Sequence, residues 1–572
     1  MHNNREPLAT EVFDILIIGA GIFGACVAWS ASLRGYSVAV IDKGDFGGAT
    51  SANHYKFIHG GIRYLQHLDI ARVRESSREK SALIRIAPHL AYPLPIVFPT
   101  YGHGRRGKEI MRAAMLTYDI LTMDRNRGIK DVQRQTPGGA IINRDQVLEL
   151  FPNISKVNLT GAAVFYDGQM YNPARLVLAF LQSATSKGAI AANYVEAKQL
   201  LLEDGRVNGS AVEDLTTGRH FDIRSRVVVN AAGPWAGYIL KNHPEYQLSP
   251  EPSFSRDLAF VVNKSVCVKY ALGCQVATQD SDALLDRGGR HLFLVPWRGM
   301  TLVGVWHKYS TAHPDEMVVS RTELKAYLDE INGAYPGLEL GLDDISMINT
   351  GHILFSSEED QGSGREHSFA KRSLLFDHMK QGLEGLISVV GARATVARGV
   401  AEKVLKIVDR KLGGRAPRVG TKWLRIQGGS FDNFAELTKE ILSKLPAGEY
   451  DLAEAIAHNY GSKYGDLFGC AMDSSGLEPI GFTNVLKAEM IHAVRHEMAT
   501  SLEDIVLRRT EFGTGSHPGS VVLEEAADIV GKEFGWDSEE RAAQVRHVHT
   551  ILAANGPWKY TGWGEDIKAS KK

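Results

Sequence analysis

The chain of 572 residues is too long for one hydrophobic core, so its length predicts two or three domains. Its hydrophobic content of 44% and charged content of 23% are typical of a globular protein, and a net charge of −1 argues against a nucleic-acid-binding surface. The 4 cysteines show no metal-ligand spacing, so we expect no metal site and buried, reduced thiols.

Residues 12–42 have the pattern of a buried strand, a glycine-rich turn, a helix and a second buried strand. The turn has the spacing G-x-G-x-x-G, formed by Gly19, Gly21 and Gly24. The first glycine permits a tight turn, the second lets the backbone approach a pyrophosphate, and the third lets helix and strand pack closely. Asp42 ends the second strand, where a carboxylate can accept hydrogen bonds from a ribose. The unit predicts dinucleotide binding; the alternative is a glycine-rich turn in another parallel-sheet protein.

The segment 45–65 is rich in small residues and then becomes basic and aromatic. Small side chains and free backbone donors suit a loop that wraps a flat cofactor, although an ordinary surface loop is the alternative. The candidate cofactor and substrate contacts here are Thr50, Ser51, Lys56, His59, Gly60, Gly61, Arg63 and Tyr64. A helix is predicted over 69–87, and an extended, proline-bounded segment over 92–99. The basic stretch 104–115 is either a solvated face or a contact with anionic lipid.

Further along, a strand is predicted over 162–166, followed by a loop and a helix from about residue 174. Glu196 and Ala197 lie at the end of another predicted short strand, a position from which the backbone of a flavin fold commonly contacts the adenine. The run 226–236 is a buried strand that leads into Ala232 and Gly233. Small residues at this strand end let a second backbone segment close on the cofactor, which favours FAD over NAD.

From about 253 to 349 the pattern is rich in strands and predicts a second domain, with a helix at 321–333. A buried strand at 386–390 then leads into another glycine turn and a helix that continues to about 408. This return to strand–glycine–helix predicts a second helix aimed at the cofactor, with contacts from Gly391, Arg393, Ala394 and Thr395. We expect a linker at 409–432 and a largely helical domain at 433–572.

The sequence resembles the FAD-dependent glycerol-3-phosphate dehydrogenases over nearly its whole length. The motifs are the segment from GAGIFGAC to KFIHGGIRYL, APHL at 87–90, VVVNAAGPWA at 227–236, FLVPWRGMTLVG at 293–304 and SVVGARATVARGVAEKV at 388–404. In the C-terminal region the segment 489–510, with RHEMAT and LEDIVLRRT, is also similar. The resemblance implies non-covalent FAD, oxidation of sn-glycerol 3-phosphate to dihydroxyacetone phosphate by hydride transfer to flavin N5, and quinone as acceptor.

The implied fold is α/β, with an FAD-binding Rossmann-type parallel-sheet domain, a β-rich substrate domain with helices, and a C-terminal helical cap domain. We expect the discontinuous FAD-binding domain at 12–95, 150–250 and 385–408, and the substrate domain at 96–149 and 251–384. The linker is expected at 409–432 and the helical cap at 433–572.

Several substrate-facing positions depart from the family pattern. The family has Gly-Gly-Lys-Leu-Thr-Thr where this chain has GARATV at 391–396, and Thr-Thr-Asp where it has Val305, Trp306 and His307. A family arginine aligns with His352, a histidine with Ala259 and a lysine with Arg256, while an arginine is retained at Arg372. We expect Arg372 and Arg393 to bind an anionic group of the substrate, and His352 or His307 to accept the alcohol proton. The candidate catalytic residues are therefore His59, Arg63, Tyr64, His352, Arg372 and Arg393.

The expected ligands are a small-molecule substrate, in particular a phosphorylated polyol, and a quinone, and a homo-oligomer is expected. One alternative is a related FAD-dependent oxidoreductase or oxidase that acts on a different hydroxyl or amine substrate. Another is an FAD-binding protein without catalysis. Residues 1–11 lack the apolar core of a signal peptide. We expect a cytoplasmic protein, with peripheral contact to the inner face of the membrane as a further expectation.

Overall fold

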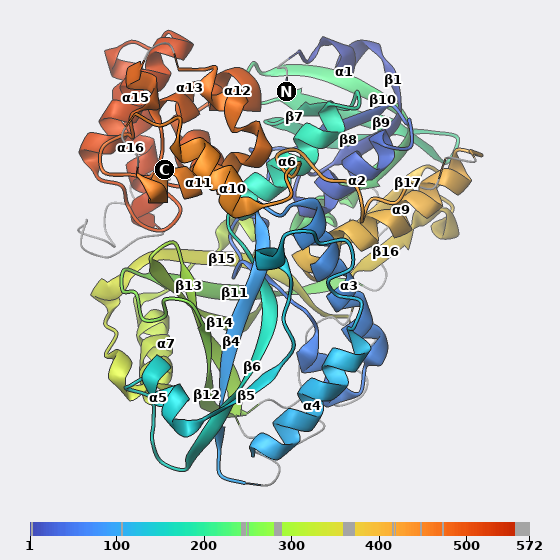
Figure 1. The fold of residues 1–572 in the computed structure, drawn as a ribbon. Coiled ribbons are helices and arrows are strands. Elements are labelled where there is room, and N and C mark those ends of the chain that lie inside the picture. The colour runs from blue at the N-terminus through green and yellow to red at the C-terminus, as the bar shows by residue number, and fades with distance from the viewer. Residues whose placement is uncertain are drawn as a thin grey trace.

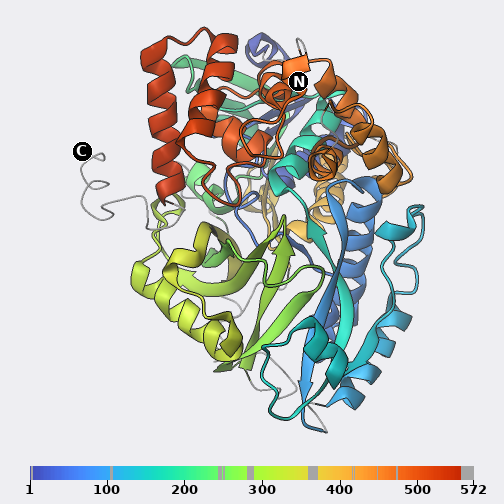
Figure 2. The same cartoon turned by 60° about the vertical axis from the view of Figure 1, so that its left-hand side comes forward.

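The computed structural model describes residues 1, 4–103, 107–241, 248, 251–279, 289–357, 372–414, 417, 419–446, 449–471 and 474–554. These residues form two sheets and a C-terminal group of helices, which lies beside the first sheet and above the second in Figures 1 and 2. The architecture is α/β, as predicted.

The first sheet has the strand order β16-β17-β10-β1-β2-β7, and β8 and β9 extend it through β10. Its strands are β1 Val12–Ile18, β2 Val38–Ile41, β7 Ile190–Ala192, β8 Val195–Glu203, β9 Arg206–Asp214, β10 Arg219–Asn230, β16 Leu374–Asp377 and β17 Leu386–Val390. β17, β10, β1, β2 and β7 are parallel neighbours. Every residue of β2 and β17 is buried, because helices and other strands cover both faces of a parallel sheet.

Three helices pack together on one face of this sheet: α2 Ile22–Ser32, α6 Pro173–Thr185 and α9 Ala397–Lys411. The short α1 Glu6–Thr10 contributes Leu8 to the core on the other face. The predicted unit β1–turn–α2–β2 is therefore confirmed, and so is the later return of the chain through β17 and α9. α9 extends to Lys411, three residues beyond the expected end of the helix at 408.

The second sheet has the order β15-β11-β14-β13-β12-β4-β6-β3, with β5 paired to β6. Its strands are β3 Phe57–Ile58, β4 Ala91–Tyr101, β5 Ala140–Asn143, β6 Leu159–Met170, β11 Pro252–Val262, β12 Ala271–Gln279, β13 Gly289–Trp297, β14 Met300–Ser310 and β15 Ile345–Ser357. Helices α5 Arg144–Leu150 and α7 Arg321–Ala334 pack into the hydrophobic core of one face. The helices α3 Ile70–Ile86 and α4 Lys108–Leu121 follow the cofactor loop and β4, respectively.

The strands near the expected domain boundaries are distributed differently from the predicted ranges. β3, β6 and the start of β4 fall within 12–95 or 150–250 but belong to the second sheet, whereas β16 falls within 251–384 but pairs with β17 in the first. The predicted strand at 162–166 is longer, because β6 pairs with β4 through Met170 and includes part of the expected loop. The extended segment at 92–99 is a strand, although it contains three prolines, at 93, 95 and 99.

The C-terminal region is helical in its described residues up to 554, as predicted, and packs in two groups. Its helices are α10 Phe434–Leu442, α11 Tyr450–Tyr460, α12 Tyr464–Phe468, α13 Lys487–Glu497, α14 Leu502–Asp504, the π-helix η14 Ile505–Arg509, α15 Ser520–Phe534 and α16 Ser538–Ala554. α10, α11 and α12 share one core, to which Ala488 at the start of α13 also contributes. The rest of α13 shares a core with α15, α16 and the second sheet, so this part of the helical region is attached to the sheet by buried apolar surface.

Candidate active site

A cavity of about 1600 Å³ lies between the first sheet, the second sheet and the C-terminal helices. Residues just beyond the carboxyl ends of four parallel strands line it: Gly19 after β1, Asp42 after β2, Ala231 after β10 and Gly391 after β17. In open α/β sheets this edge is where ligands bind. Strands β11, β14 and β15 of the second sheet supply the opposite wall.

The glycine-rich turn keeps a backbone surface open at one end of the cavity. Gly19 has φ +102°, and a Cβ there would lie 2.6 Å from the carbonyl oxygen of Ala231. A Cβ on Gly24 would lie 1.9 Å from the carbonyl oxygen of Gly19, so this residue permits the close packing of α2 on the turn. Gly21 begins α2 without a side-chain cap, and the amide of Ile22 donates to Ser51 Oγ at 3.0 Å. The turn and helix end thus fit a pyrophosphate group.

Asp42 lies beside this turn. Its carboxylate accepts hydrogen bonds from the amide of Ala20 at 2.7 Å and from the amide of Gly44 at 3.0 Å. Burial raises the pKa of Asp42 to about 6, although the two backbone hydrogen bonds act in the opposite direction. Glu196 and Ala197 line the same region, although they begin β8 and do not end a strand as predicted, because the preceding strand β7 already ends at Ala192. With Asp42 they form a continuous wall suited to an adenosine.

The strand β3 and the turn that follows it, residues 57–61, are hydrogen-bonded to the segment after β17 at the other end of the cavity. The amide of His59 donates to Thr395 Oγ1 at 3.1 Å, and the amide of Gly60 donates to Asp167 Oδ1 at 2.6 Å. The ring Nδ1 of His59 lies 3.7 Å from Asp167 Oδ2. A Cβ on Gly391 would lie 1.9 Å from the ring of Phe23, so the segment 391–395 also requires close approach to α2.

A cluster of arginines lies around Tyr64. The guanidinium carbon of Arg393 is 5.0 Å from the centre of the Tyr64 ring, and that of Arg72 is 4.5 Å away. Arg393 donates to Tyr64 Oη and, at 3.3 Å, to Ser76 Oγ, whereas Arg72 pairs with Asp69 at 2.9 Å. All of these except Ser76 line the cavity, as does Arg63.

Arg372 is exposed and is not among the described lining residues. Its positive charge nevertheless reaches this region. Partial burial favours a raised pKa for Asp69, but hydrogen bonds from Arg72 and the charges of Arg72 and Arg372 lower that pKa. Arg372 therefore stands close enough to the arginine cluster to add to its positive potential.

Two histidines stand on the wall formed by the second sheet. His307 Nδ1 lies 2.7 Å from Asp257 Oδ1, which also accepts from Ser255 Oγ at 2.9 Å. His352 Nε2 lies 3.2 Å from Ser310 Oγ. Burial, and then the charge of Arg256, lower the pKa of His352, so its ring is neutral at pH 7.

Most of the predicted site residues line this one cavity. They are Gly19, Gly21, Asp42, Thr50, Ser51, His59, Gly61, Arg63, Tyr64, Glu196, Ala197, Ala232, Gly233, His352, Gly391, Arg393, Ala394 and Thr395. Gly24, Lys56, Gly60 and Arg372 are not among the lining residues. Lys56 is buried behind the wall, where Nζ donates to Asn349 Oδ1 at 3.1 Å and lies 4.5 Å from the Trp297 ring centre.

Among the positions that depart from the family pattern, Ala259, Val305 and His307 line the cavity. Trp306 instead lies in the core, stacked on Phe260 and Tyr327. Arg256 is directed to α7, where it pairs with Glu323.

Five residues that line the cavity were not predicted from the sequence: Arg72, Asp167, Asp257, Glu503 and Arg508. Arg72 lies in the first turn of α3, seven residues beyond the end of the cofactor loop 45–65, and that proximity was an available signal. The others come from the second sheet and the C-terminal region, and nothing in their local sequence indicates that the fold brings them to the cofactor side.

Comparisons with known proteins agree with this arrangement. Residues 14–391 match the FAD dependent oxidoreductase family, and residues 419–541 match the C-terminal domain of alpha-glycerophosphate oxidase. A glycerol-3-phosphate dehydrogenase of Synechocystis is 28% identical over 96% of this chain and 98% of its own. A probable mitochondrial glycerol-3-phosphate dehydrogenase of Caenorhabditis elegans is 30% identical over 95% of this chain and 73% of its own.

Comparison with solved structures gives a similar fold. The structure of the glycerol-3-phosphate dehydrogenase from Bacillus halodurans complexed with FAD superposes with a TM-score of 0.74 at 23% identity, covering 96% of each chain. The open glycine turn, the buried Asp42 and the cavity at the strand ends fit the FAD that this family binds. The chain therefore belongs to the FAD-dependent glycerol-3-phosphate dehydrogenase family, and it is an oxidoreductase with FAD as its cofactor.

Proposed function

We propose that this protein oxidises sn-glycerol 3-phosphate to dihydroxyacetone phosphate and passes the electrons to a quinone. The names of its relatives support the substrate. The observation that carries the proposal is the arginine cluster of Arg72 and Arg393 around Tyr64, which lines the cofactor cavity. Two guanidinium groups on one wall are suited to a phosphate monoester, because each fork can donate two hydrogen bonds to its oxygens.

Different parts of the cavity would hold the different parts of FAD. The turn at Gly19 and Gly21 would hold the pyrophosphate, Asp42 the ribose, and the wall at Glu196 and Ala197 the adenine. The loop at His59 and the segment at Thr395, which are joined by a hydrogen bond, would hold the flavin end. When bound, FAD supplies the hydride acceptor at N5 for the carbinol carbon of the substrate.

The protein must also accept the hydroxyl proton of the alcohol. We assign this role to His352, because it lines the cavity and its ring is neutral at pH 7. Its Nε2 lies 3.2 Å from Ser310 Oγ, which fixes the ring on this wall. His307, held by Asp257, is the second candidate on the same wall.

Anaerobic mixing with substrate tests the proposal, with flavin absorbance as the readout. We expect glycerol 3-phosphate to reduce the wild-type flavin and free glycerol to be a poor substrate. Arg393→Ala should raise half-saturation about tenfold to a hundredfold, because one charge-assisted contact contributes about 1.5–3 kcal/mol. Arg372→Ala should have a smaller effect in the same direction, since Arg372 is exposed. Arg393→Lys, which restores the family residue, should retain most activity.

The alternative is a flavin enzyme for a different hydroxyl or amine substrate. It predicts that glycerol 3-phosphate leaves the flavin oxidised while another compound reduces it, and that Arg393→Lys weakens that native reaction. Unchanged half-saturation in both alanine variants would remove the anion site from the proposal. Re-oxidation of the reduced enzyme by a short-chain quinone under anaerobic conditions tests the acceptor.

We further propose a cytoplasmic protein that contacts the membrane surface and forms a homo-oligomer. None of the described helices is long and apolar enough to cross a membrane. Support for surface contact comes from exposed apolar side chains: Leu68, Ile70 and Ile110 line the cavity, and Leu116 and Ile120 lie on α4. Light scattering of the purified protein tests the oligomeric state.

A further inference from the structure

The C-terminal region reaches the cofactor cavity through one short element. Among the described residues of the C-terminal helical region, Glu503 and Arg508 line the cavity. Arg508 and Arg509 end the π-helix η14, in which the amide of Thr510 donates to the carbonyl of Ile505 at 2.9 Å. π-turns are rare and often occur at functional sites. Here the turn directs two consecutive arginines toward the same residue of the first sheet's cofactor loop.

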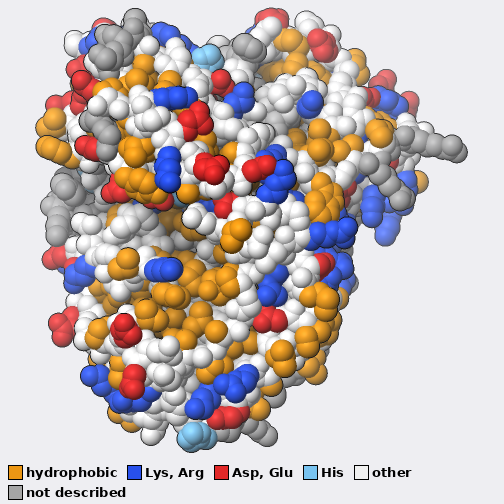
Figure 3. Space-filling view, viewed as in Figure 1, with side chains coloured by type: hydrophobic (Ala, Val, Ile, Leu, Met, Phe, Trp, Pro, Cys, Tyr) orange, Lys and Arg blue, Asp and Glu red, His pale blue; other side chains and the backbone are white. Residues whose placement is uncertain are grey.

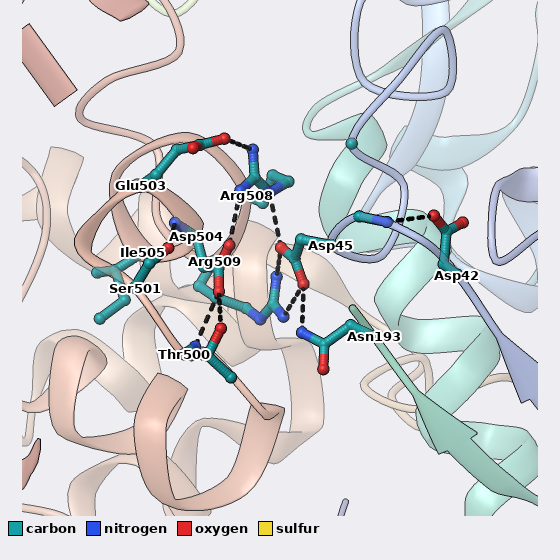
Figure 4. A network of polar contacts seen from close by, with 12 residues as sticks. Asp42, Asp45, Asn193, Thr500, Ser501, Glu503, Asp504, Ile505, Arg508 and Arg509 are labelled. Atoms are coloured by element: carbon teal, nitrogen blue, oxygen red, sulfur yellow. Dashed lines mark hydrogen bonds and ion pairs between the residues drawn. The ribbon is translucent and has the colours of Figure 1, made fainter. Parts of the chain in front are cut away.

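That residue is Asp45, and its side chain is fully buried. As Figure 4 shows, its carboxylate faces Arg508, Arg509 and Asn193. It accepts from Arg508 Nε at 2.6 Å, from Arg509 Nη1 at 2.7 Å and Nη2 at 2.8 Å, and from Asn193 Nδ2 at 2.9 Å. Burial favours a raised pKa for Asp45, but the two guanidinium groups, Arg509 first, lower it well below its ordinary value. Asp45 is therefore an ionised anchor at neutral pH.

The arginines are themselves fixed from the C-terminal side. Arg508 donates to Glu503 Oε1 at 2.7 Å and to Asp504 Oδ1 at 2.6 Å. Asp504 Oδ1 also accepts from the hydroxyl of Tyr194 at 2.6 Å. Tyr194 lies next to β8 and lines the cavity, so the network joins η14 to two segments of the adenosine wall.

The anchored loop is the one that the cofactor must contact. The loop 42–48 is hydrogen-bonded to the glycine-rich turn at two points. The carboxylate of Asp42 accepts from the amide of Ala20, and the amide of Gly47 donates to the carbonyl of Ala20 at 3.2 Å. Gly48 also lines the cavity, and a Cβ there would lie 3.7 Å from Arg508 Cδ. The loop 42–48 is thus held by the first sheet on one side and by η14 on the other.

We propose that η14 is a working part of the FAD site: Arg508 and Arg509, acting through Asp45, hold the loop 42–48 in its FAD-binding shape. These are positioning residues. It follows that docking of the C-terminal region and binding of FAD strengthen each other, because a coupling between two equilibria is reciprocal.

The matched pair Asp45→Asn and Glu497→Gln tests the proposal. Both replace a buried carboxylate at the same contact between the sheets and the C-terminal region. Glu497 pairs with Arg175 at 2.6 Å but does not line the cavity, and it holds Arg509 through its backbone carbonyl, which the substitution leaves in place. We expect Asp45→Asn to raise the Kd for FAD at least tenfold in a fluorescence titration of the apoprotein, and Glu497→Gln to change it less than threefold.

Hydrogen exchange of the wild-type protein provides a second measurement that does not require a folded variant. FAD should slow exchange of the amides at 500–510 at least tenfold, although these residues belong to the C-terminal region. An unchanged Kd in folded Asp45→Asn, or equal weakening in both variants, would show that the network only joins the domains. Exchange at 500–510 that is insensitive to FAD would equally overturn the proposal.

Discussion

Gly21 and Gly24 are three residues apart in the same turn but meet different surroundings. A Cβ on Gly24 would lie 1.9 Å from a backbone oxygen, whereas a Cβ on Gly21 would lie 3.0 Å from the hydroxyl of Ser51 at the cavity surface. Backbone cannot move aside, but a serine side chain can rotate. Gly24 is therefore required for the packing of the protein itself, and Gly21 for the approach of the pyrophosphate.

We predict that Gly21→Val keeps the protein folded but raises the Kd for FAD at least a hundredfold, because the added side chain occupies the pyrophosphate position. Gly24→Ala, although smaller, should lower the stability of the apoprotein by about 2 kcal/mol or more. Circular dichroism of the apoproteins and flavin release on heat denaturation measure both effects. Full flavin occupancy in Gly21→Val would show that the pyrophosphate lies elsewhere.

A second prediction at this scale concerns Asp42, whose pKa in the apoprotein is about 6. Hydrogen bonds from a bound ribose favour the ionised carboxylate, so FAD binding lowers this pKa. FAD affinity should then be constant above about pH 6 and fall as the pH drops below it, by up to about tenfold per pH unit. Titrations from about pH 5 to about pH 8 measure this dependence. Asp42→Asn should bind more weakly and lose it; the same acid dependence in that variant would assign the effect to another group.

At the scale of elements, α4 has two different faces. Met115 and Tyr118 are buried, whereas Leu116 and Ile120, one turn apart, are 62% and 57% exposed. Ile110 of the same helix lines the cavity together with Leu68 and Ile70. Figure 3 shows hydrophobic side chains at the lower right, where α4 lies in Figure 1. Lys108 and Arg112 of this helix are balanced by Glu109 and Asp119, so the exposed apolar side chains are the feature that α4 shares with helices lying on a membrane surface.

We predict that the protein co-sediments with anionic liposomes and that Leu116→Ser/Ile120→Ser reduces this binding at least tenfold, since two apolar side chains then lose their burial in lipid. Val318→Ser/Val521→Ser is the matched control, because both valines are exposed but lie outside α4. Added salt should weaken the remaining binding. Equal binding by the two double variants would show that α4 does not make the membrane contact.

At the scale of the whole molecule, features that depend on neighbouring residues could be predicted from the sequence, whereas contacts between distant segments could not. The turn at Gly19, the strand end at Asp42 and the segment after β17 were predicted because each has its reason within about thirty residues of chain. The extension of β6 to Met170 was not, because it depends on pairing with β4, which lies far away in the sequence. Arg508 could not be assigned to the cofactor side either, since only the docking of η14 brings it to Asp45.

The C-terminal helices are joined to the rest of the molecule by two kinds of contact, the ionic network at Asp45 and a hydrophobic core shared with the second sheet. Leu523 of α15 is fully buried in that shared core, near Val548 of α16 and together with Leu94, Trp297 and Leu302 of the sheet. Leu437 of α10 is equally apolar but belongs to the core formed by helices alone. If both cores unfold in one transition, damage to either lowers the stability of the whole protein.

We predict this single transition. Leu523→Ala and Leu437→Ala should each lower the free energy of unfolding by about 2–5 kcal/mol, the cost of a cavity in a packed core. In both variants the midpoint of helix loss, followed by circular dichroism, and the midpoint of flavin release, followed by fluorescence, should fall together. Saturating FAD should raise both midpoints, since a ligand at a hundred times its Kd adds about 2.7 kcal/mol. A helical transition in Leu437→Ala that precedes flavin release would show instead that α10, α11 and α12 unfold independently, leaving only η14 and the shared core coupled to the cofactor.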